Sequence, residues 1–258
     1  MKFDHIVVTR EGPLSIFLIN RVDSSNALHA AAHRELAAAF DEFAADDSQW
    51  VAIISGAGNK AFCAGHDLKQ QALGGGLEFP PSGFGGLTAR SDLNKPVIAA
   101  VNGVAMGGGF EIALACDLII ASENAVFALP EPRVGLAALC GGMQRLPREI
   151  GLKQAMGIML TGRRVSAREG YEMGFVNEVT SGDVLDAAKR WAGEILACSP
   201  LSIRATKEAV LKGLFLETSE ALKAQHRYPA VQQLLASEDA VEGPRAFTEK
   251  RVPIWKGR

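Results

Sequence analysis

The apolar and polar positions at the start of the chain predict a strand pair followed by a helix. Two strand-like runs, over 6–9 and 14–19, flank a turn at Glu11-Gly12-Pro13 and indicate a hairpin. Apolar residues then recur at helical spacing, which predicts a helix with Asn26 as its N-cap. The apolar positions of this helix are Leu28, Leu36, Phe40 and Phe43.

Later apolar runs are short and continuous, which is typical of strands buried on both faces. These runs predict strands at 51–54, 97–101, 117–120 and 125–129. Strands that alternate with helices indicate an α/β core with crossover connections. Between them, the segment from Gly74 to Gly86 is rich in Gly, Pro and Phe, so we expect a mobile surface segment there.

Helical patterns dominate after about Gly151, and this change predicts a helix-rich second half. The expected helices cover 153–160, 166–173, 183–197, 201–216 and 218–235. A length of 258 residues suits one domain, alone or with a helical appendage.

Composition narrows the possible functions. With 48% hydrophobic and 22% charged residues the chain can fill a sizeable core. Its net charge of −2 lacks the excess of positive charge that nucleic-acid binding requires. The four cysteines are scattered without metal-binding spacing, so we expect buried thiols and no metal. The N-terminus lacks signal-peptide features and no apolar run reaches the ~20 residues that span a bilayer. We therefore expect a cytoplasmic protein that binds neither membrane nor nucleic acid.

Two glutamates stand in contexts that make a carboxylate chemically active. Glu111 lies in an apolar segment just after the turn Gly107-Gly108-Gly109, and Glu131 follows Pro130 at the end of a predicted strand. Burial of a lone carboxylate costs several kcal/mol or raises its pKa until it is neutral. Two such acids indicate a pair that transfers protons.

The glycine-rich turn also provides backbone donors. The first N–H groups of a helix have no internal partner, so the N–H of Gly108 can face developing negative charge. A second turn after Phe62 offers the N–H of His66, and together the two donors would form an oxyanion hole. We do not expect the His66 imidazole to be a metal ligand or a base, because no second ligand lies at suitable spacing.

Two other chemistries fit the sequence less well. A nucleophilic Ser or Cys is the main competitor, but the chain has no G-x-S-x-G motif. A dinucleotide site would need G-x-G-x-x-G spacing and a later acid, which Gly107-Gly108-Gly109 lacks.

Several motifs in this order resemble the crotonase (enoyl-CoA hydratase/isomerase) superfamily, over essentially the whole chain. They are Lys60 to Leu68 (KAFCAGHDL), Lys95 to Gly103 (KPVIAAVNG), Gly107 to Glu111 (GGGFE), Leu129-Pro130-Glu131, Gly141 to Leu146 (GGMQRL), Leu160 to Arg164 (LTGRR) and Phe247 to Arg251 (FTEKR). The chain is most similar to the carnitinyl-CoA (crotonobetainyl-CoA) hydratase branch in 83–88, in 237–244 and in the ending Trp255-Lys256-Gly257-Arg258.

The resemblance implies a ββα-spiral core over 1–198 and a C-terminal helical region over 199–258 that mediates trimerisation, often as a dimer of trimers. It implies an acyl-CoA substrate, with coenzyme A as part of it and no separate cofactor. The thioester oxygen would lie between the N–H groups of His66 and Gly108, and both glutamates would hold the water that is added. Contacts with coenzyme A or substrate are implied for Ser24, Ala64, Asp67, Leu68, Leu139, Phe247 and Lys250.

Two departures from the family pattern affect the substrate pocket. Typical hydratases have a lysine that contacts coenzyme A just before the first helix, where this chain has Asp23-Ser24-Ser25-Asn26. Lys250 of a neighbouring subunit is a candidate to replace that contact. Leu139 stands where Gly or Asp is common, so it would make one wall of the pocket bulkier and more apolar.

The leading hypothesis is an enoyl-CoA hydratase, which is a hydro-lyase. Alternatives are enoyl-CoA isomerase or another crotonase-type enzyme, including a thioester hydrolase or carnitinyl-CoA dehydratase; the presence of both acids disfavours the isomerase. One family branch binds RNA through a lysine-rich first helix, but residues 27–43 contain no Lys and only Arg34. A scaffold paralogue without activity is disfavoured because both acids remain.

Overall fold

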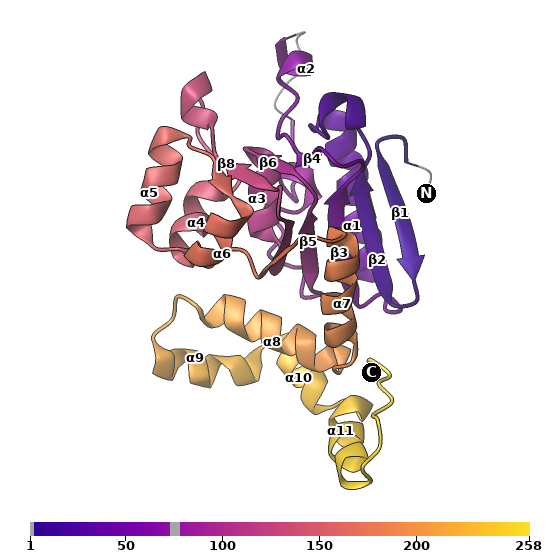
Figure 1. The fold of residues 1–258 in the computed structure, drawn as a ribbon. Coiled ribbons are helices and arrows are strands. Elements are labelled where there is room, and N and C mark those ends of the chain that lie inside the picture. The colour runs from indigo at the N-terminus through magenta and orange to yellow at the C-terminus, as the bar shows by residue number, and fades with distance from the viewer. Residues whose placement is uncertain (1–2, 73–77) are drawn as a thin grey trace.

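The computed structural model describes residues 3–72 and 78–258, and within them two sheets form the core. Figure 1 shows α1 and α7 beside the larger sheet, α3 to α6 around the smaller one, and α8 to α11 grouped apart from both sheets. The mixed order of strands and helices confirms the predicted α/β class.

The larger sheet has six strands in the order β1-β2-β3-β5-β7-β10. Its first two strands form the predicted hairpin, with Glu11 opposite Leu14, and all other neighbours in this sheet are parallel. The strands are β1 (Ile6–Glu11), β2 (Leu14–Ile19), β3 (Val51–Gly56), β5 (Val97–Val101), β7 (Leu118–Ser122) and β10 (Glu178–Thr180). The predicted strands at 51–54, 97–101 and 117–120 are confirmed to within two residues.

The smaller sheet has four strands in the order β4-β6-β8-β9. They are β4 (Ala61–Cys63), β6 (Val104–Met106), β8 (Val126–Ala128) and β9 (Val165–Ser166). Each of β3, β5 and β7 is followed, after a short turn, by a strand of this second sheet and then by a helical segment. This repeated strand–strand–helix step is the spiral that the resemblance implied.

The inner strands β2, β3 and β5 of the larger sheet are buried on both faces, as the continuous apolar runs at 51–54 and 97–101 predicted. Leu14 and Ile16 face the cluster that includes Ala188 of α7 (Val184–Leu196), whereas Phe17 faces the cluster that includes Phe40 of α1 (Ala30–Ala45). Successive side chains of one strand therefore pack into two separate cores. Packed on both faces, the sheet is a rigid base for the loops at its edge.

The remaining helices are α2 (Leu68–Ala72), α3 (Gly108–Ala115), α4 (Gly142–Glu149), α5 (Leu152–Thr161), α6 (Ala167–Met173), α8 (Pro200–Gly213), α9 (Thr218–Ala224), α10 (Pro229–Leu235) and α11 (Glu238–Thr248). Among them, α5, α6 and α8 lie where the sequence predicted them, whereas α4 and α11 were not predicted. In the part of the chain that the structure describes, no helix combines the length and apolarity needed to cross a membrane. The division at residues 198 and 199 stays a prediction.

The single helix expected over 218–235 is wrong, because the chain divides it into α9, a 3₁₀ turn over Gln225–Arg227 and α10. Pro229 is the cause. Its ring pushes Tyr228 into an extended conformation, with φ −73° and ψ 136°, and it has no N–H to continue a helix from the preceding turn.

The N-cap prediction for Asn26 is also wrong. His29 caps α1 by accepting the N–H of Ala32, while Asn26 has a left-handed φ of 57°. The Asn26 side chain instead donates to the carbonyls of Ala57 and Ala61 at 3.0 and 2.7 Å. It therefore fixes the turn between β3 and β4.

The segment 74–86 was expected to be a mobile surface segment. Residues 74–77 lie outside the described residues. For its C-terminal end the expectation is wrong, because Phe84 is only 2% exposed and 84–86 form a buried 3₁₀ turn. Gly86 packs against α1, where a Cβ would lie 2.4 Å from the backbone of Ala37.

Candidate active site

The start of α3 is a tight turn that places Glu111 inside the protein. The chain leaves β6 through Gly107, whose φ of +53° is unfavourable for other residues, and α3 begins at Gly108. A Cβ at Gly109 would lie 2.0 Å from the carbonyl oxygen of Cys63, so this helix can approach β4 only with glycine there. Glu111, in the first turn, is 2% exposed.

The loop between β4 and α2 lies against this turn. Gly65 has a φ of +91°, and a Cβ on it would lie 2.7 Å from the carbonyl oxygen of Met106 and 3.3 Å from the nitrogen of Gly108. The carbonyl of Gly65 and the N–H of Asp67 both bond to Leu28. His66 between them keeps its N–H free of acceptors among the described residues, as does Gly108. Two free backbone donors therefore lie on adjoining loops.

Glu111 is held by α4. Its Oε1 accepts the N–H of Gly142 at 2.9 Å. Burial raises the pKa of Glu111 to about 7, and the negative charge of Glu131 acts in the same direction, while the Gly142 N–H opposes them. This carboxyl can gain and lose a proton near neutral pH.

Glu131 lies on the other side of the same turn, at the start of the 3₁₀ turn Glu131–Val134. A Cβ on Gly107 would be 2.9 Å from its Oε1. Its Oε2 is buried and has no partner within residues 3–72 and 78–258. Burial raises the pKa of Glu131 as well. The unpartnered oxygen is free to bind a water molecule or a substrate group.

The structure thus brings the two acids and the two backbone donors together around Gly107 and Gly108. The helix start faces this space, so the positive end of its dipole adds to the N–H groups. The arrangement can stabilise negative charge on one oxygen and move protons beside it.

The residues near α2 for which the resemblance implied substrate contacts differ in exposure and in bonding. Asp67 is engaged internally, because its Oδ2 pairs with Arg21 at 3.0 Å and its Oδ1 accepts the N–H of Gln70 at the start of α2. Ala64 donates its N–H to Ser25, which places it beside the exposed Ser24. Leu68 and, near α4, Leu139 are exposed to 48% and 78%.

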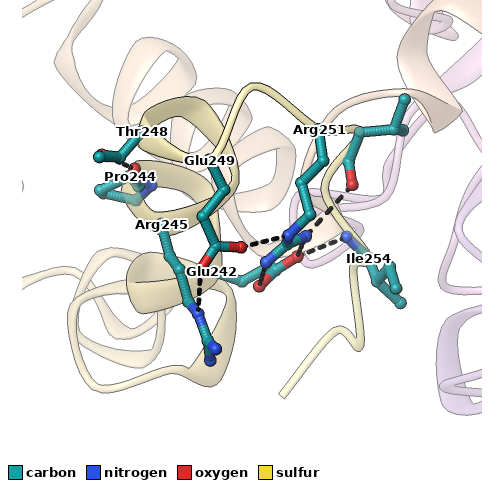
Figure 2. A network of polar contacts seen from close by, with 8 residues as sticks. Glu242, Pro244, Arg245, Thr248, Glu249, Arg251 and Ile254 are labelled. Carbon is teal, nitrogen blue, oxygen red and sulfur yellow. Dashed lines mark hydrogen bonds and ion pairs between the residues drawn. The ribbon is translucent and has the colours of Figure 1, made fainter.

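Phe247 and Lys250 are not brought to the site of their own chain. They lie at the end of α11 and just beyond it, and Figure 1 places α11 at the opposite end of the molecule from α3 and β8. Figure 2 shows how the end of α11 is fixed: Arg251 binds both oxygens of Glu242 at 2.6 and 2.9 Å and also Glu249. Phe247 is 86% exposed beside this network. These side chains are therefore not part of the site of their own chain.

Sequence reasoning missed several neighbours of the acids. The N–H of Gly142 donates directly to Glu111, a role that the motif Gly141-Gly142 does not indicate in the sequence. The thiol of Cys140 lies near both acids, and burial together with their charges raises its pKa to about 12. Phe84 packs against Gly108, and no local pattern in the sequence indicates this contact.

A sequence profile described as enoyl-CoA hydratase/isomerase matches residues 11–258, and the chain belongs to this family. It is 44% identical over 259 residues to a carnitinyl-CoA dehydratase of Proteus mirabilis, covering 97% of this chain and 98% of the relative. A carnitinyl-CoA dehydratase of Salmonella paratyphi A is 45% identical over 262 residues, with the same coverage.

Solved structures agree with this assignment. An enoyl-CoA hydratase of Mycobacterium tuberculosis H37Rv superposes with a TM-score of 0.93 at 39% identity, over 98% of this chain and 99% of that one. An enoyl-CoA hydratase of Bacillus anthracis gives 0.90 at 35% identity, over 99% and 100%. The crotonase fold and the family resemblance are confirmed.

Proposed function

We propose that this protein adds water reversibly across the 2,3-double bond of an acyl-CoA thioester, as an enoyl-CoA hydratase. The observation that carries this proposal is the pair of acids, the buried Glu111 and the half-buried Glu131, beside two unpartnered backbone N–H groups. Water addition needs two proton transfers next to a carbonyl that becomes an enolate, and this site offers groups for each step.

In the proposed reaction the thioester oxygen accepts hydrogen bonds from the N–H groups of His66 and Gly108. One carboxylate takes a proton from water while the water oxygen bonds to C3, and the double-bond electrons move onto the thioester oxygen. The other carboxyl then gives a proton to C2, and the carbonyl re-forms. Because both acids have raised pKa values, the pair can hold the single proton that this exchange requires.

The carnitinyl-CoA dehydratases among the relatives favour a second candidate, the same chemistry on a carnitinyl or crotonobetainyl group. For either substrate we propose a homotrimer or a dimer of trimers in the cytoplasm, within acyl-CoA or fatty-acid metabolism. Exposed apolar residues on α8 support an assembly, and Phe247 and Lys250 would contact the coenzyme A bound by a neighbouring copy. The α8 residues are Val210 and Leu211, followed by Leu214 and Phe215 just beyond the helix.

The test is hydration of 2-enoyl-CoA substrates, followed by loss of the enoyl-thioester absorbance. Glu111→Gln and Glu131→Gln keep the side-chain shape but remove the acid, so each should lower kcat by about 10²–10⁴-fold. Glu123→Gln, on an exposed turn, is the matched control. Turnover close to the wild-type rate in either acid variant would refute the two-glutamate mechanism.

A further inference from the structure

A cluster of four rings adjoins the oxyanion hole, where Phe84 packs against Gly108. The ring of His33, on α1, packs edge-on against Phe84 with ring centroids 4.4 Å apart. The ring of Phe79 is perpendicular to that of His33, with centroids 5.1 Å apart. The ring of His66 is parallel to that of His33, with centroids 6.3 Å apart, and also meets Phe79 edge-on. Nothing in the proposed mechanism uses these side chains.

His33 carries a buried donor without a partner. It is 0% exposed, and its Nδ1 accepts the N–H of Gly85 at 3.0 Å. Burial lowers the pKa of His33 to about 3, so the ring is neutral and its proton lies on Nε2. That Nε2 is buried and has no acceptor in the described part of the chain. A buried N–H left unpaired costs about 1–3 kcal/mol, which favours a ligand atom that accepts its hydrogen bond.

His66 adds to this unsatisfied capacity. Both of its ring nitrogens are buried, and neither has a partner among residues 3–72 and 78–258. Burial lowers its pKa too, so the ring is neutral and one of its nitrogens is a donor. The cluster therefore presents an N–H from each of two imidazoles, and both are complementary to an oxygen atom.

The cluster lies close enough to the hole to contact a bound acyl group. A Cβ on Gly108 would lie 2.4 Å from Cζ of Phe84, so this ring covers the first residue of α3. Arg21, whose positive charge acts on His33, already forms an ion pair with Asp67 at 3.0 Å. It is therefore not available to bind a phosphate of coenzyme A on this side. Phe79 is 36% exposed and forms the open edge. The acyl end of the substrate is what remains to occupy it.

We propose that the imidazoles of His33 and His66 bind an oxygen atom of the acyl group, so that the preferred substrate is a 2-enoyl-CoA whose chain carries a hydroxyl or a carboxylate. This inference rests on the proposed hydratase function and specifies its substrate class. A trimethylammonium group has no acceptor for these donors, so the cluster favours an oxygenated chain over a crotonobetainyl one.

The experiment compares kcat/KM for crotonyl-CoA, 4-hydroxycrotonyl-CoA, glutaconyl-CoA and crotonobetainyl-CoA. At least one of the two oxygenated substrates should exceed crotonyl-CoA by about tenfold or more. His33→Asn places an amide oxygen near the position of Nδ1 for the Gly85 N–H but removes the Nε2 donor, so it should lower that preference about tenfold. His29→Asn is the matched control, because His29 lies on the same chain segment and its Nδ1 also accepts a backbone N–H, at 3.2 Å from Ala32.

A second variant covers the case in which His33→Asn does not fold. His66→Phe keeps a ring in the cluster and the N–H at position 66 while it removes both ring nitrogens, so the preference should fall in the same way. The proposal is overturned if crotonyl-CoA or crotonobetainyl-CoA is the better substrate, or if His33→Asn changes the preference no more than His29→Asn. Failure of the wild-type protein to hydrate any of the four substrates would overturn the proposed function itself.

Discussion

Replacing Glu111 with Gln should stabilise the fold at alkaline pH while it removes activity. Glu111 is 2% exposed, and burial raises its pKa to about 7. Ionisation of this group therefore favours the unfolded chain, where the carboxylate is hydrated. A glutamine of the same shape has no charge to bury, so the variant avoids that cost.

The size of the effect follows from the pKa. The difference between about 7 in the folded chain and the ordinary value of 4.5 corresponds to about 3.4 kcal/mol when the group is fully ionised. In the variant the introduced amide oxygen can still accept the N–H of Gly142, but an NH₂ group replaces the second carboxylate oxygen, at a cost of about 1 kcal/mol. A net gain of about 2 kcal/mol at pH 8 would raise Tm by about 5 °C.

The pH dependence has a definite sign. Because the folded pKa of Glu111 is raised, its contribution to stability is fully present below pH 4.5 and is lost as the pH rises through about 7. The wild-type protein should therefore lose about 2.5 kcal/mol from this group between pH 5 and pH 8, and the variant should not.

Unfolding of both proteins by heat and by urea at pH 5 and pH 8 measures this difference. Protein concentration must be equal in all samples, since assembly shifts apparent stability. Glu123→Gln serves as the control and should change neither value. The reasoning fails if Glu111→Gln is less stable than the wild type at pH 8, or if its advantage is the same at both pH values.

Two further predictions concern the hole and the assembly. Gly108→Pro removes a hydrogen-bond donor and pushes against Phe84, so it should lower kcat by about 10²–10³-fold. His66→Ala keeps the backbone N–H and should lower kcat on crotonyl-CoA by under about tenfold. Equal losses in both folded variants would assign the chemistry to the imidazole. Light scattering should give about three or six times 27.4 kDa, and Lys250→Ala should raise KM for the coenzyme A thioester; a fully active monomer would refute both.

Much of the fold could be predicted from the sequence because the pattern is local. Strands buried on both faces give continuous apolar runs, and 97–101 was predicted with its observed bounds. The role of Asn26 could not be read in this way, because its partners Ala57 and Ala61 are more than 30 residues away. An asparagine ahead of a helix has the same local signature whether it caps the helix or fixes a distant turn.

The same limit applies to the site. The acids and glycines were recognisable because each lies beside a turn that the sequence itself specifies. The contacts that tune them cross the fold: Gly142 reaches Glu111 from α4, and Phe84 reaches Gly108 from the segment after α2. The burial of Phe84 against Gly108 follows from tertiary packing, which the pattern of a single segment does not contain.

The distribution of unsatisfied polar groups connects stability with function in this protein. In the described part of the chain five buried side-chain nitrogen or oxygen atoms have no partner, and all but the Nε of Arg204 belong to His33, His66 or Glu131 around the hole. Stability normally requires that buried polar atoms be hydrogen-bonded, so each of these atoms costs free energy that a bound water or substrate group can recover. A concentration of such atoms at one place is therefore what a binding site would produce, and random imperfections of packing would be scattered through the core.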